Sequence, residues 1–163
     1  MKKLLATVAL VSSFATSAYA QEPKEIFGSW KVVSIETITA GKSDKPMGDK
    51  PMGFLTITPT RVNIMFTESD RKVESARLSD AEALKMFKSS VAWTGHIVSA
   101  TASPKGVMLI VHVDAANNQG LVDKDRNYVV TLTGDKMMWT SPGIIDPQTG
   151  MNSSLEFALV KSE

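Results

Sequence analysis

The side chains most able to do chemistry in this sequence are its two histidines, each of which lies in an apolar run. Asp114 follows His112 by two residues, which places both on the same face of a strand. An imidazole beside a carboxylate can act as a general base or can orient a bound molecule. With Tyr128 as a donor, His96 or His112 would be the general base of an isomerase, cyclase or hydrolase, or a polar anchor in a binding cavity. The alternative is that both histidines are hydrogen-bonded on the outer surface.

Whether the two histidines meet depends on the turn between the segments that carry them. The turn residues Pro104 and Lys105 predict that these segments pair as a hairpin. A two-residue loop would set His96 opposite Val113, whereas a loop with an odd number of residues would set His96 opposite His112. In the second register both imidazoles share one face of the sheet. The sequence leaves both registers open.

Other kinds of site lack the residues that they require. The chain has no cysteine, which excludes disulfides, zinc–thiolate sites, iron–sulfur clusters and thiol nucleophiles. No third ligand stands at a zinc-binding spacing from the histidines, and the methionines do not cluster as a copper site would need. No G-x-S-x-G motif, phosphate-binding loop or dinucleotide fingerprint is present. We therefore predict neither a metal nor a cofactor.

The N-terminal segment has the three regions of a secretory signal peptide. Lys2 and Lys3 form a basic start, residues 4–15 are mainly apolar, and residues 18–20 read Ala-Tyr-Ala, a typical cleavage site. The apolar run is shorter than the roughly 20 residues that span a membrane. We therefore predict that residues 1–20 are removed, which leaves a periplasmic or secreted chain with no membrane span.

The predicted mature chain, residues 21–163, is nearly neutral. Cleavage removes two lysines and leaves 16 basic and 17 acidic residues, a net charge of −1. A chain of this balance, with no basic run, has no electrostatic surface for nucleic acid or for anionic membranes. Its length and the 43% of hydrophobic residues in the full sequence favour one domain around a single core.

The mature chain consists mainly of short segments with β-branched and aromatic residues, separated by glycine, proline and asparagine. The expected strands cover residues 29–39, 54–58, 61–67, 91–100, 107–114, 121–133, 136–141 and 153–161. Eight strands at this spacing predict an all-β fold, either an antiparallel sandwich or a closed barrel, rather than alternating β-α units.

A tandem repeat lies in the loop expected over residues 40–53. The sequence Asp-Lys-Pro-Met-Gly occupies residues 44–48 and then residues 49–53. Five residues are too few for a repeat architecture, whose units have roughly 20 to 50 residues. We therefore expect one loop here, followed by a strand.

One segment has the signature of a helix. Ser79 and Glu82 have the spacing of a capping box, in which each side chain bonds to the other residue's backbone. The residues that follow are mostly good helix formers. We predict a helix over residues 80–89, with Leu84 and Phe87 among the side chains turned toward the core.

Several expected strands are apolar on both faces. In the strand over residues 107–114, Leu109 points one way with three valines, while Met108 and Ile110 point the other way. A sheet with one face in water would alternate more cleanly. Eight antiparallel strands that close by pairing the first with the last would fit this pattern, with an interior that is filled or holds a small ligand.

The sequence Gly28-Ser29-Trp30 resembles the opening motif of lipocalins and calycins, and further segments resemble the bacterial lipocalin-like domain family. These segments are residues 28–34, 51–59, 92–95, 111–113 and 132–136, in the family's order. The resemblance implies an eight-stranded, calycin-like antiparallel barrel with one short helix, a fold usually tied to binding a small apolar molecule. It also implies that Trp30 plugs the closed end below a basic residue, for which Lys161 is available. Arg126 is the candidate for the arginine that often opens a later strand in that family.

The function that we predict is non-catalytic binding of a small, largely apolar molecule inside the barrel. Apolar side chains would supply burial, and polar ones would fix the orientation. A filled barrel would instead indicate a structural or interaction protein. Trp93 and His96 lie on opposite faces of a regular strand, so only one of them lines the cavity unless a bulge intervenes. The candidate ligand-binding residues are Phe54, Met65, Trp93, His96, His112 and Tyr128.

Overall fold

The computed structural model describes residues 23–69, 78–145 and 150–162. Its elements are η1 (Pro23–Ile26), β1 (Gly28–Thr39), β2 (Lys42–Asp44), β3 (Met52–Ile57), β4 (Arg61–Thr67), α1 (Asp80–Lys88), β5 (Ser90–Ser103), β6 (Gly106–Ala116), η2 (Gln119–Leu121), β7 (Asp125–Thr133), β8 (Lys136–Ile145) and β9 (Asn152–Lys161). The predicted signal peptide, residues 1–20, lies outside the described residues.

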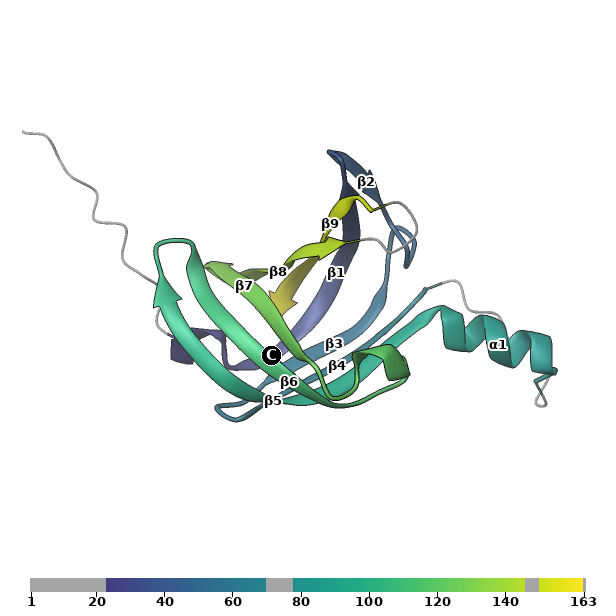
Figure 1. Cartoon of the computed structure of the whole chain (residues 1–163), viewed down its shortest axis with the longest axis horizontal. Helices are drawn as coiled ribbons and strands as arrows, with labels where there is room; N and C mark the ends of the chain where they lie inside the picture. The colour runs from purple at the N-terminus through teal and green to yellow at the C-terminus, as the bar shows by residue number, and fades with distance from the viewer. Residues whose placement is uncertain (1–22, 70–77, 146–149, 163) are drawn as a thin grey trace, which may run out of the picture.

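Eight of the strands close into an antiparallel barrel (Figure 1). Each strand from β3 to β8 pairs with the next one in the sequence, and β1 pairs with both β3 and β9. The β1–β9 register runs from Trp30 opposite Lys161 to Thr39 opposite Ser153, so the first and last strands close the sheet as predicted. The short β2 adds a further strand beside the end of β1. The predicted all-β class, with an eight-stranded antiparallel barrel and one short helix, is confirmed.

The start of β1 closes one end of the barrel around a tryptophan. Trp30 is fully buried, and its Nε1 donates a hydrogen bond to the carbonyl oxygen of Ile26 in η1, 2.9 Å away. The Lys161 ammonium lies 5.9 Å from the centre of a Trp30 ring, within the range of a cation–π contact. Trp30 therefore joins η1, β1 and the last residue of β9.

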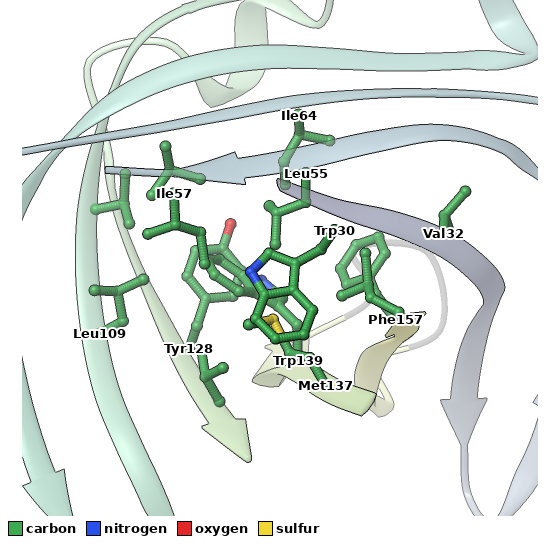
Figure 2. Close-up of a cluster of buried hydrophobic side chains, with 14 of the residues drawn as sticks. Trp30, Val32, Leu55, Ile57, Ile64, Leu109, Tyr128, Met137, Trp139 and Phe157 are labelled. Atoms are coloured by element: carbon green, nitrogen blue, oxygen red, sulfur yellow. The ribbon is translucent and has the colours of Figure 1, made fainter. Parts of the chain in front are cut away.

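Aromatic side chains from several strands meet inside the barrel (Figure 2). The Tyr128 ring centre lies 4.6 Å from that of Trp139 and 6.1 Å from that of Trp93. The rings of Phe66 and Phe157 are 5.5 Å apart. Aromatic pairs at these separations attract each other beyond the gain from buried area. Together with the aliphatic side chains around them, they form one continuous core.

The two ends of the barrel have different connections. At the Trp30 end, β3–β4, β5–β6 and β7–β8 are joined by turns of two or three residues. Because antiparallel strands alternate in direction, the longer connections gather at the opposite end. These are the segments between β1 and β3, β4 and β5, β6 and β7, and β8 and β9. We call this second end the loop end.

The helix α1 forms where the sequence predicts it but does not join the core. Its capping box is present: the Ser79 hydroxyl accepts from the Glu82 backbone N–H, and the Glu82 carboxylate accepts from the Ser79 backbone N–H. The helix projects away from the barrel, and none of its residues is buried (Figure 1). Leu84 and Phe87 are each 53% exposed, so the prediction that they face the core was wrong. Neither α1 nor any other described helix is long and apolar enough to cross a membrane.

Four of the described strands carry an extra residue relative to a neighbouring strand. The extra residue is Val33 in β1, Val98 in β5 and Asp114 in β6, and in β8 it lies between Ser141 and Ile144. An extra residue on one strand bends it and increases its twist. The bulges therefore help the long strands β5 and β6 to curve around the barrel.

Candidate functional site

Two of the predicted cavity residues, Phe54 and Met65, lie on the outer face of the barrel. They are cross-strand partners in β3 and β4, and their exposed fractions are 48% and 64%. Their neighbours Leu55 and Ile64, which are also partners, are buried. Successive side chains in a strand point to opposite faces, so only one of these pairs can face the core. The prediction that Phe54 and Met65 line the interior was therefore wrong.

Trp93 and Tyr128, by contrast, both point into the barrel. Each is buried, and their rings are stacked with an angle of 11° between the ring planes. The structure thus brings these two predicted residues together on the inner face of β5 and β7. Their binding of a ligand stays a prediction.

The two histidines are cross-strand partners on the outer face. His96 pairs with His112, and their ring centres are 5.0 Å apart. The turn has two residues, with Ser103 opposite Gly106, yet the register expected from such a turn does not reach His96. The bulge at Val98 shifts the pairing of β5 with β6 by one residue between Ser99 and Ile97. The imidazoles therefore meet because of a bulge, and the odd-numbered loop that we considered is absent.

Asp114 holds His96 in place from the neighbouring strand. One carboxylate oxygen lies 2.7 Å from His96 Nδ1, and the other accepts a hydrogen bond of 2.7 Å from Arg61 Nη2. The contact with His96 and the positive charge of Arg61 hold the pKa of Asp114 below its usual value. The carboxylate therefore stays ionised and fixes the orientation of the imidazole.

His112 lies between two carboxylates. Its Nδ1 is 2.8 Å from Asp125 and its Nε2 is 3.3 Å from Asp123. The contact with Asp125 contributes most to raising the pKa of His112, and Asp123 adds to the effect, while partial burial opposes it. Both ring nitrogens can donate only when the imidazole is protonated. The site therefore favours the imidazolium.

The prediction that the histidines line the cavity was wrong. In β5 and β6 the residues next to the histidines point into the barrel, so the histidines themselves point outward. Gly95 and Val111 face the interior, whereas His96 is half exposed on the outer face. A reaction that uses a histidine base and Tyr128 as donor needs both in one cavity, and the sheet separates them. Among the described residues, no three histidine, aspartate or glutamate side chains are grouped so that they could hold a metal ion.

The raised pKa of His112 gives its contribution to stability a definite pH dependence. The unfolded chain has the ordinary histidine pKa of about 6.5, so folding favours the protonated form. The stabilisation is complete below that pH and is lost as the pH rises through the pKa of the folded state. We expect an NMR titration to give His112 a pKa above 6.5, and Asp125→Asn to lower it. A folded-state pKa at or below 6.5 would contradict this expectation.

The inner face of the loop end also carries polar groups that the sequence analysis did not include in the site. Arg126 lies two residues before Tyr128 on β7, which places both on the same face. This alternation was the signal that could have identified Arg126. Ser141 on β8 is buried, and Trp139 Nε1 is buried with no hydrogen-bond acceptor among the described residues.

A hollow at the loop end gives access to some of these groups. The pairing of β7 with β8 ends at Val129 and Thr140. Beyond that point lies a space of about 380 Å³ between the two strands. Its lining residues are Asp125, Arg126, Asn127, Ser141, Pro142, Gly143 and Ile145. The volume falls within the range of small-molecule sites.

Comparison with protein families gives a match that covers nearly all of the barrel. The lipocalin-like domain family matches residues 27–161, through the last residue of β9. Neither a curated protein nor a solved structure gives a significant match. A barrel of this kind fits ligand binding in general. In sequence and in architecture, the chain belongs to the lipocalin-like domain family.

Proposed function

We propose that this protein is exported and binds a small, largely apolar molecule at the loop end of its barrel, without converting it chemically. The observation that carries the proposal is the hollow between β7 and β8. Its lining residue Arg126 lies two residues before Tyr128, which forms a buried aromatic pair with Trp93. Trp93 and Tyr128 offer the apolar contact surface, and Arg126 and Ser141 offer polar groups for orientation. An apolar contact surface combined with a few polar groups that fix orientation is typical of small-molecule sites.

Export is supported by the N-terminal sequence and by the composition. The basic start, apolar run and Ala-Tyr-Ala site are the features that a signal peptidase recognises. A chain without cysteine also folds without disulfides in an oxidising compartment. We therefore place the mature protein in the periplasm or outside the cell.

Mass spectrometry of the protein purified from the exported fraction tests both parts of the proposal. Under denaturing conditions we expect the mass of a chain that begins at Gln21. Under native conditions we expect an additional small molecule bound at one copy per chain. A chain that retains residues 1–20, or a native mass with no bound molecule, would contradict the respective part.

Two matched variants locate the molecule on the protein. Trp93→Leu removes an aromatic ring from the inner face, so we expect the bound molecule to be largely lost. Phe54→Leu removes a ring from the outer face, so the bound fraction should match that of the wild type. Thermal unfolding of both variants separates loss of binding from loss of folding. Equal occupancy in the two variants would place the molecule outside the barrel.

A further inference from the structure

Both histidines of the sequence lie in one row of side chains on the outer face of the barrel. The row crosses β4, β5, β6 and β7, and its members in that order are Arg61, His96, His112 and Asp125. The two imidazole centres are 5.0 Å apart, and both rings are partly exposed. The fold therefore brings the imidazoles of the chain together at a place that solvent reaches, and the proposed function does not use them.

Each imidazole is held through its Nδ1 by a carboxylate. Asp114 lies 2.7 Å from Nδ1 of His96, and Asp125 lies 2.8 Å from Nδ1 of His112. A histidine that binds a metal almost always donates its other ring N–H in this way, which fixes the tautomer and the orientation of the ring. Among the described residues His96 Nε2 has no hydrogen-bond partner, and His112 Nε2 has a contact of 3.3 Å with the almost fully exposed Asp123. Both Nε2 atoms are therefore accessible to a metal ion.

The separation of the two rings suits a single ion bound to both. A bond from zinc to a histidine nitrogen is about 2.0–2.1 Å long, which places each ring centre about 3.2 Å from the ion. At a tetrahedral angle two such ring centres are about 5.2 Å apart. The observed separation of 5.0 Å is close to this value. Within the described chain no third protein ligand completes the group, so water fills the remaining coordination positions.

The charges around the two imidazoles favour a cation. Arg61 balances Asp114, whereas Asp123 and Asp125 have no cationic partner other than His112 among the described residues. These two carboxylates stabilise positive charge on His112, and its pKa is raised for that reason. A divalent ion at Nε2 places its charge at the same point and displaces the proton that the imidazole carries there.

We propose that His96 and His112 together bind one divalent transition-metal ion, Zn²⁺ or Cu²⁺, through their Nε2 atoms on the outer face of the barrel. Imidazole nitrogen suits both ions, whereas Ca²⁺ and Mg²⁺ require oxygen ligands. The sequence analysis predicted no metal because the two histidines come from different strands and meet only through the bulge at Val98. The site lies on the opposite side of the sheet from the barrel interior, so the inference is independent of the proposed function.

Metal titration of the mature chain tests the proposal. The protein is prepared without a histidine tag, stripped with a chelator, and titrated with Zn²⁺, Cu²⁺ and Ca²⁺ near neutral pH by calorimetry. We expect one Zn²⁺ per chain, tighter binding of Cu²⁺, and no binding of Ca²⁺ at the same concentrations. Because the sequence has two histidines, NMR follows each imidazole separately, and Zn²⁺ should shift the signals of both together.

Four substitutions assign the ion to the histidine pair. His96→Gln and His112→Gln each remove one ligand, and each is expected to weaken Zn²⁺ binding at least tenfold. Asp125→Asn removes the carboxylate that holds His112 and should weaken binding about tenfold. Asp135→Asn is the charge-matched control in the exposed turn between β7 and β8, and should change the affinity less than about twofold. Thermal unfolding without metal confirms that all four variants are folded.

Three results would overturn the proposal. One is that neither Zn²⁺ nor Cu²⁺ binds the wild-type chain. Another is that Zn²⁺ binds equally well after either histidine is replaced, and the last is that Ca²⁺ binds as tightly as Zn²⁺, because carboxylates alone would then hold the ion. None of these results bears on the molecule in the barrel, which native mass spectrometry and Trp93→Leu test separately.

Discussion

Replacing Trp30 with alanine is expected to lower the free energy of unfolding by about 3–5 kcal/mol, the range for truncating a large buried aromatic side chain. Trp30 is among the largest fully buried side chains of the barrel. Its indole also donates to the Ile26 carbonyl oxygen, which the alanine variant leaves without that donor. Urea unfolding followed by circular dichroism measures the change without relying on tryptophan fluorescence.

Two further variants divide the contribution of Trp30 into parts. Trp30→Phe keeps most of the packing but loses the hydrogen bond to Ile26, so its loss of stability should be smaller than that of the alanine variant. Lys161→Met removes the cation from above the ring and is expected to cost about 0.5–1 kcal/mol. A loss below about 1 kcal/mol for Trp30→Ala would show that the barrel end is held by other contacts.

The barrel could be predicted because its determinants are local and regularly spaced. Short β-rich segments between turn residues indicated the eight barrel strands and their order, but not the short β2 in the loop expected over residues 40–53. Antiparallel pairing of neighbours follows from short connections. The capping box of α1 is similar, since Ser79 and Glu82 contact each other within one helical turn. Closure between β1 and β9 is a long-range contact, but eight strands with apolar residues on both faces leave few other ways to bury them.

The candidate site could not be predicted as well, because it depends on which face of each strand points inward. In β6, Leu109 is fully buried and Met108 is 40% exposed, although both side chains are apolar. Nothing in the sequence marks Val98 as a bulge, yet this residue sets His96 opposite His112. The apolar residues of α1 show the same limit: periodicity identifies a face, and tertiary packing decides whether anything covers it.

The tandem repeat shows how far identical local sequence can diverge in a folded chain. Met47, in the first copy, is buried, whereas Met52 in the second copy is 51% exposed at the start of β3. The glycines that end the copies differ as well. Gly48 lies in a loop with a φ of +72°, and Gly53 lies inside β3 with a φ of +131°. We expected the loop to extend through Gly53, because glycine usually marks turns, but β3 already begins at Met52.

Replacing Gly53 with alanine is expected to lower the free energy of unfolding by about 2–5 kcal/mol, since two costs combine. A side chain rarely adopts its backbone conformation, and the new Cβ would overlap the Met65 backbone oxygen on β4. Gly48→Ala is the matched control, because it follows the same Pro-Met pair and meets no atom within 4 Å. Its positive φ alone should cost about 1 kcal/mol. Urea unfolding of both variants measures the difference. Equal losses would mean that β3 and β4 can separate at Gly53 without cost, and that the close approach of their backbones does not hold this side of the barrel together.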